Sequence, residues 1–133
     1  YGPIHGYNTF ESESQNLTVI NKKYNSEEFI QELLNSDIYV LPSIRESFGI
    51  VALEAMAMGK ILISSNTLGV NEFIKDGVNG FIINNKKELN NKIQYVYKNW
   101  DKIRNISKEA HITATQYSRD KIALNLIKLY KKI

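Results

Sequence analysis

The stretch that decides the fold is IYVLPSIRESFGIVALEAMAMGKILIS, residues 38–64, in which two apolar runs enclose a helical pattern. The runs at 38–41 and 61–64 show no alternation of polar and apolar residues, which is typical of strands buried on both faces of a parallel sheet. Gly59 stands where a glycine in the left-handed conformation commonly follows a helix. We therefore predict a strand, a helix over 50–58 and a second strand.

The segments on either side extend this alternation of strands and helices. Short apolar runs predict strands at 17–20 and 81–83, and apolar stripes at helical spacing predict helices at 26–35, 70–75 and from 86 to the end of the chain. Strands that alternate with helices are typical of a parallel sheet wound with right-handed crossovers. The predicted class is therefore α/β, with a parallel sheet flanked by helices and further helices at the C-terminus.

Composition restricts the possible functions. The chain has 133 residues, enough for one globular domain, and its hydrophobic and charged fractions of 43% and 23% are ordinary for a soluble protein. It has no cysteine, and its two histidines, His5 and His111, have no ligand-like spacing, so we expect no metal. No apolar run approaches membrane-spanning length and no leader pattern opens the chain, so we expect a cytoplasmic protein.

The net charge of +3 is mild, and the lysines concentrate in the last third of the chain. Solvated helix faces are the simpler interpretation of these lysines. The alternative is a basic surface that rests on anionic lipid head groups at the inner face of the cytoplasmic membrane. Basic and aromatic residues do not interleave as they do in nucleic-acid-binding motifs, so we expect no nucleic-acid partner.

The loop between the first predicted strand and the next helix is the expected ligand site, since ligands of open α/β sheets bind beyond the carboxyl ends of strands. Gly49 lets the backbone approach a ligand, and the N–H groups of Gly49, Ile50 and Val51 would favour an anion such as a diphosphate. Glu46 precedes the helix, and Glu54 lies about 8 Å further along its axis. The two carboxylates would bracket a ligand at the helix start.

The apolar residues around Glu54 give a second reason to expect that it is functional. Its helix is apolar nearly all round, and a carboxylate buried among such residues is costly unless it is hydrogen-bonded. We therefore interpret Glu54 as a functional residue. The alternatives remain open: Glu54 as a surface glutamate, and Glu46 as a residue that only favours the positive end of the helix dipole.

ESFGIVALEAMAMG, residues 46–59, resembles the E-x7-E motif of the GT-B fold glycosyltransferases of family 4, the glycosyl transferases group 1. DIYVLPS, residues 37–43, and GVNEFIKDGVNGFII, residues 69–83, are similar to the segments that precede and follow it in that family. The resemblance covers nearly the whole chain. It implies a Rossmann-like domain, the C-terminal half of a GT-B fold, with residues 1–133 forming a nucleotide-sugar-binding domain.

The same resemblance implies the chemistry. A nucleoside-diphosphate sugar is the donor of a retaining transfer to a saccharide or lipid acceptor, in bacterial polysaccharide or glycolipid synthesis, and neither a metal nor another cofactor is required. Glu46 is the catalytic residue, which holds hydroxyls of the transferred sugar and stabilises the oxocarbenium charge, whereas Glu54 accepts hydrogen bonds from the ribose. The implied donor-binding residues are Glu46, Ser47, Phe48, Gly49, Ile50, Val51 and Glu54.

Departures and missing parts qualify these expectations. Asn21 stands where members of the family often have glycine, which leaves the base undecided, and Glu72 either matches a common glutamate or only braces the 70–75 helix. The family's basic pair and its N-terminal acceptor domain lie upstream of Tyr1, so we expect an incomplete domain that transfers little by itself. The alternatives are a nucleotide-sugar epimerase of the same fold and a non-catalytic binding or interaction module.

Overall fold

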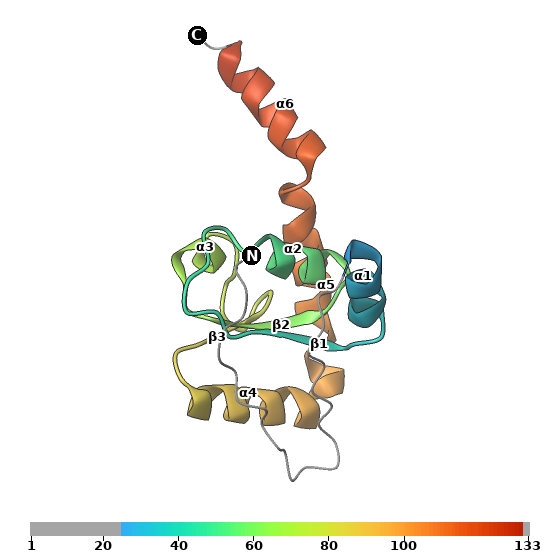
Figure 1. Cartoon of the computed structure of the whole chain (residues 1–133), viewed down its shortest axis with the longest axis vertical. Helices are drawn as coiled ribbons and strands as arrows, with labels where there is room; N and C mark the ends of the chain where they lie inside the picture. Colours follow the sequence, from blue (N-terminus) through green and yellow to red (C-terminus); the bar gives the residue numbers. More distant parts are fainter. Residues whose placement is uncertain (1–24, 132–133) are drawn as a thin grey trace.

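The computed structural model describes residues 25–131 and is built on a parallel sheet (Figure 1). Within these residues the sheet has three strands in the order β1-β2-β3, namely β1 (Ile38–Leu41), β2 (Ile61–Ser65) and β3 (Phe81–Ile83). Ile38 pairs with Ile61, and Ile63 pairs with Phe81, both in parallel register. These pairings confirm the predicted α/β class. The strand predicted at 17–20 lies outside the described residues.

Helices cover both faces of this sheet. Helices α2 and α5 lie on one face, and α4 lies on the other (Figure 1). The helices are α1 (Ser26–Leu34), α2 (Ile50–Ala57), α3 (Leu68–Asn71), α4 (Lys86–Lys98), α5 (Arg104–Gln116) and α6 (Arg119–Tyr130), with a 3-10 turn η1 (Trp100–Lys102).

The central strand β2 explains why both faces must be covered. Leu62 packs into a core with Met56 of α2 and Ala110 of α5, whereas Ile61 and Ile63 pack on the opposite face with Val96 of α4. All three β2 residues are almost completely buried. A strand that buries successive side chains on opposite faces needs apolar residues at every position, which is why its sequence shows no alternation.

Helix ends follow the predicted chemistry, with one correction at α3. Gly59 follows α2 with φ of 69°, the left-handed conformation expected there. The helix predicted at 70–75 is wrong, because α3 begins and ends earlier, at Leu68–Asn71. Asn79 accounts for its early end: it accepts a hydrogen bond from Lys75 N at 2.7 Å and donates one to Phe73 O at 2.8 Å. These backbone groups are therefore held in a turn instead of continuing the helix.

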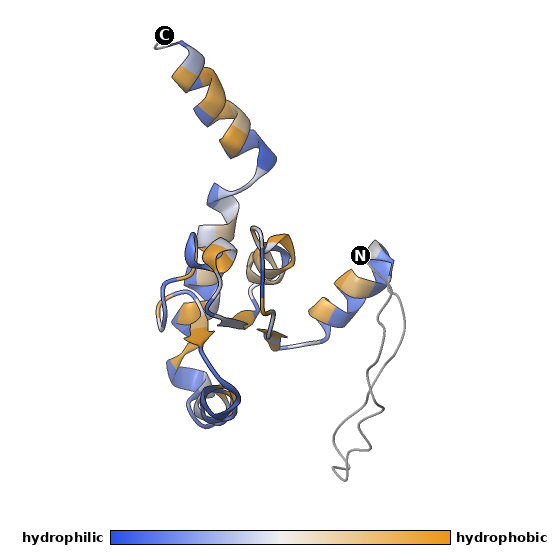
Figure 2. Cartoon of the chain, turned by 60° about the vertical axis from the view of Figure 1, so that its left-hand side comes forward, coloured by the Kyte–Doolittle hydropathy of each residue, from blue (hydrophilic) through white to orange (hydrophobic). Residues whose placement is uncertain are grey.

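Helix α6 extends away from the rest of the molecule (Figure 1). Apolar residues run along it in Figure 2, and Ile122, Leu126 and Leu129 are each about half exposed. Across residues 25–131, no helix combines the length and the apolar character that crossing a bilayer requires.

Candidate functional site

The predicted site lies where the chain leaves β1 and enters α2, beyond the carboxyl end of the sheet. Gly49 is the residue before α2, and it adopts a left-handed conformation with φ of 80° and ψ of 46°. It is also buried, and a Cβ atom there would lie 3.1 Å from Val70 Cγ2 and 3.5 Å from Phe73 Cζ. Both the conformation and the space therefore favour glycine at this point.

The first turn of α2 leaves backbone donors available. The N–H groups of Ala52 and Leu53 both donate to Gly49 O, at 3.0 and 3.2 Å. In the part of the chain that the structure describes, the N–H groups of Ile50 and Val51 have no acceptor, and no side chain caps the helix. Unpaired N–H groups at the positive end of a helix can bind the oxygens of an anion.

Glu46 is held by a neighbour that the sequence analysis did not single out. Ser43 Oγ donates a 2.8 Å hydrogen bond to Glu46 Oε1, and both residues are half-buried. This contact fixes the orientation of the carboxylate before any ligand binds. The only sequence signal for it is a serine three residues before the glutamate, a spacing at which a loop brings two side chains together.

Glu54 is exposed, so the argument from its apolar neighbours is wrong. Ala52, Ala55 and Met56 point into the core, but Ile50 is 64% exposed and lies with Glu54 on the open side of α2. Because α2 covers only one face of the sheet, its apolar sequence does not imply burial all round. An exposed carboxylate keeps its hydration and needs no buried partner, and its role in binding stays a prediction.

The loop backbone lies directly against α3, a contact that sequence reasoning missed. A Cβ atom at Gly69 would lie 2.7 Å from Phe48 N, from Phe48 Cα and from the carbonyl carbon of Ser47. No side chain fits in that space, so Gly69 lets α3 support the segment that carries two predicted donor-binding residues. The sequence shows a glycine at position 69, but the need for glycine there comes from a contact between segments 21 residues apart.

An aromatic cluster fixes the side chain of Phe48. The rings of Phe48, Phe73 and Tyr117 pack edge to face, with centroids 5.7–6.0 Å apart. The hydroxyl of Tyr117 also donates to Glu72 O at 3.2 Å, whereas the Glu72 side chain is exposed. Tyr117 therefore has a packing role, and the cluster joins the loop to the end of α5.

Histidine and carboxylate side chains gather no metal site within residues 25–131. The described histidine, His111, has a structural contact, since Nδ1–H donates to the carbonyl oxygen of Ala57 at 2.6 Å. His5 and Asn21 lie outside the described residues. The start of α2 offers backbone N–H groups and the carboxylates of Glu46 and Glu54.

Comparison with protein families and with curated proteins gives a consistent result. The family model described as glycosyl transferases group 1 matches residues 10–113. The N,N'-diacetylbacillosaminyl-diphospho-undecaprenol alpha-1,3-N-acetylgalactosaminyltransferase of Campylobacter jejuni is 36% identical over 109 residues, which cover 80% of this chain and 29% of that protein. The putative glycosyltransferase EpsD of Bacillus subtilis is 31% identical over 104 residues, which cover 76% of this chain and 27% of that protein. The chain thus spans less than a third of the length of these relatives.

Solved structures share the fold. The structure of Anabaena Alr3699/HepE in complex with UDP-glucose has a TM-score of 0.70 and 26% identity, covering 80% of this chain and 30% of that one. A glycosyltransferase from Rickettsia africae has a TM-score of 0.72 and 29% identity, covering 81% of this chain and 30% of that one. The predicted fold, a parallel sheet of the GT-B type flanked by helices, is confirmed.

Proposed function

The chain belongs to the glycosyl transferases group 1 family, and on that premise we propose that its domain binds the nucleoside-diphosphate sugar of a retaining glycosyl transfer. The observation that carries the proposal is the start of α2. There the N–H groups of Ile50 and Val51 have no acceptor among the described residues, the oriented carboxylate of Glu46 precedes them and the exposed carboxylate of Glu54 follows.

In this proposal each group has one task. The N–H groups at the helix start bind the diphosphate and stabilise the negative charge that grows on it as it leaves. The Glu46 carboxylate accepts hydrogen bonds from hydroxyls of the transferred sugar and stabilises the positive charge that develops at its anomeric carbon. Glu54 accepts hydrogen bonds from the ribose hydroxyls, and the backbone of Ser47, Phe48 and Gly49 lies against the sugar. Backbone donors and carboxylates suffice for these tasks, so the proposed mechanism uses no metal.

Uridine diphosphate is the first nucleotide to test. Structures of Anabaena Alr3699/HepE hold UDP-glucose, UDP with glucose, and UDP, and all three share this fold with 26–27% identity. This likeness supports a nucleotide-sugar donor for the present chain. The sugar stays open, because the proposed contacts involve hydroxyls that many hexoses share.

The acceptor side is also a proposal. Relatives are more than three times as long as the matched segment, and we propose that an N-terminal domain of the same protein supplies the acceptor site. The Campylobacter jejuni relative is named for a lipid-linked saccharide substrate. A saccharide or lipid-linked acceptor, in bacterial polysaccharide or glycolipid synthesis at the inner face of the cytoplasmic membrane, is therefore the class that we propose, and the domain by itself transfers little.

A thermal-shift panel tests donor binding. UDP, GDP and ADP, with their common sugar conjugates, are added to the wild-type chain and to the Glu54→Ala variant. A nucleotide present at about 100 times its dissociation constant stabilises the folded state by about 2.7 kcal/mol. We expect the nucleotides of one base to stabilise the wild type. In Glu54→Ala, the affinity for that nucleotide should be at least about tenfold lower.

The matched control is Glu32→Ala, which removes an exposed glutamate from α1, away from the loop. It should leave nucleotide binding unchanged. An equal loss in both variants would contradict the role of Glu54, and no stabilisation by any nucleotide would contradict donor binding and favour a non-catalytic module. If the nucleotide binds and a chain with its N-terminal domain transfers sugar, the anomeric configuration of the product separates retention from inversion. Interconversion of the free nucleotide sugar would instead indicate an epimerase.

A further inference from the structure

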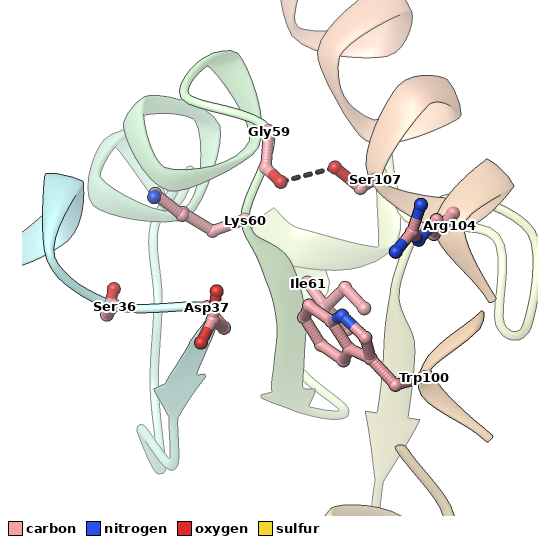
Figure 3. Close-up of a pocket in the computed structure, with 8 residues that line it drawn as sticks. All are labelled: Ser36, Asp37, Gly59, Lys60, Ile61, Trp100, Arg104 and Ser107. Atoms are coloured by element: carbon pink, nitrogen blue, oxygen red, sulfur yellow. Dashed lines mark hydrogen bonds between the residues drawn. The ribbon is translucent and has the colours of Figure 1, made fainter. Parts of the chain in front are cut away.

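A cavity lies at the opposite edge of the sheet from the proposed donor site. It is formed where β1 and β2 begin, beside η1 and the first turns of α5 (Figure 3), and its volume is about 380 Å³. That volume is within the range of small-ligand sites, about 300–1,000 Å³. None of the residues proposed to bind the donor lines this cavity.

The walls of this cavity are tied to one another. Ile61 N donates to Asp37 O at 3.1 Å, and Lys60 Nζ donates to the carbonyl oxygen of Leu34 at 3.2 Å. Ser107 Oγ donates to the carbonyl oxygen of Gly59, a bond drawn in Figure 3. These contacts join α1, the β2 entry and α5, so the cavity is present without a ligand.

Two side chains around the cavity have free recognition groups, and a third, Arg104, is held only by an exposed ion pair. Trp100 is 37% exposed, and its indole lies beside Ile61, with Asp37 to one side and Arg104 to the other (Figure 3). Within the described part of the chain, neither the Asp37 carboxylate nor the Trp100 indole N–H has a hydrogen-bond partner. Arg104 contacts Asp101 at 3.3 Å, but this pair is 73% and 90% exposed and is held only weakly.

This set of groups fits a polyhydroxylated ring. An indole face offers apolar surface to the C–H groups of a pyranose, while its N–H donates to an oxygen. A carboxylate accepts from hydroxyl donors, and a guanidinium donates to hydroxyl oxygens in a fixed fork. The alternation of donors and acceptors around one aromatic plane matches neighbouring hydroxyls on a sugar.

Charge favours a neutral ligand over an anionic one. Lys60 and Asp37, which both line the cavity, carry opposite charges, and the positive charge of Arg104 is offset by its pair with Asp101, which lies outside the lining. A phosphate at the cavity would be repelled by the Asp37 carboxylate. A neutral saccharide is not repelled by the Asp37 carboxylate.

We propose that this cavity is an accessory binding site for a neutral saccharide, which holds part of a glycan away from the donor site. The saccharide class rests on the proposed function, since a glycosyltransferase domain meets glycans as acceptors or products. Binding here would keep a growing glycan beside the domain while transfer takes place at the opposite edge of the sheet.

Trp100 is the single tryptophan of the chain, so its fluorescence and its indole resonance report this cavity without any label. The chain is titrated with neutral di- and trisaccharides of glucose, galactose, N-acetylglucosamine and N-acetylgalactosamine. Emission is excited where tyrosine does not absorb, and the indole N–H is followed by NMR. We expect a saturable change with at least one saccharide, and a loss of affinity of about tenfold in Asp37→Asn, because a hydrogen bond to a charged carboxylate is replaced at best by a weaker one to a neutral amide.

Asp120→Asn, an exposed change on α6, is the matched control and should bind the saccharide as the wild type does. A flat titration with every saccharide would overturn the proposal, as would a response that Asp37→Asn leaves unchanged or that Glu54→Ala abolishes. A response to inorganic phosphate with none to saccharides would also overturn it in favour of an anion site. UDP binding is measured separately by thermal shift: UDP binding without a saccharide response refutes only this inference, and the reverse refutes only the proposed donor function.

Discussion

Replacing Gly69 by alanine tests whether α3 positions the backbone of the proposed donor loop. A Cβ atom at this position would lie 2.7 Å from Phe48 N, Phe48 Cα and the carbonyl carbon of Ser47, against about 3.4 Å for an ordinary contact. About 0.7 Å must therefore be gained by moving α3 and the loop apart. The atoms in the way belong to the backbone, so a change of rotamer cannot provide that space.

The expected magnitude follows from this overlap. Overpacking a well-filled site commonly costs about 1–3 kcal/mol, and at about 4 °C per kcal/mol for a domain of this size the melting temperature should fall by about 4–12 °C. The shift also moves the N–H groups of the loop by a fraction of an ångström. Because hydrogen bonds weaken steeply with distance and angle, we expect UDP or the preferred nucleotide to bind at least about tenfold more weakly.

The assay pairs thermal unfolding with nucleotide titration, and Gly77→Ala is the matched control. Gly77, unlike Gly69, has a positive φ, of 73°, but a Cβ atom there would meet nothing within 4 Å. Its substitution should cost about 1–2 kcal/mol from backbone strain alone and leave nucleotide affinity unchanged. If Gly69→Ala binds nucleotide as tightly as the wild type, or if both variants lose affinity equally, the reasoning about α3 and the loop is refuted.

Three further predictions concern single contacts. Ser43→Ala frees the Glu46 carboxylate, so we expect glycosyl transfer by the protein with its N-terminal domain to fall several-fold while the nucleotide dissociation constant stays the same; a change in affinity alone would contradict this. Asn79→Ala removes three hydrogen bonds from a buried side chain and should destabilise the fold by about 2–4 kcal/mol, measured by denaturant unfolding. Hydrogen bonds from the backbone and then the side chain of Asn84 lower the pKa of Glu88 below its ordinary value of 4.5, so this carboxylate contributes stability above that pH and loses it as the pH falls through the folded-state pKa. The stability difference between wild type and Glu88→Gln should therefore be largest near neutral pH and shrink in acid, and a constant difference would contradict this origin.

Much of the fold follows from local sequence. The unbroken apolar runs at 38–41 and 61–64 predicted two buried parallel strands because a strand covered on both faces has no polar side, and the structure confirms that both runs form parallel strands. Burial on both faces is confirmed for β2, whereas β1, at the edge of the described sheet, is half-buried along its length. The end of α2 followed from Gly59, whose left-handed conformation needs no information beyond the neighbouring turn. The family was also predictable, since the E-x7-E string and its flanking segments lie within the matched residues.

The tertiary structure decided where the predicted site residues lie and what holds them. Glu54 is exposed because α2 covers only one face of the sheet, which an apolar helix sequence does not reveal. The α3 helix ends early because Asn79, several residues later, binds Phe73 O and Lys75 N, the backbone groups just beyond its end. Gly69 and Tyr117 act on Phe48 across long separations in the chain. Local patterns fix which elements form, because they depend on neighbouring residues, whereas contacts between distant segments depend on how those elements pack in space.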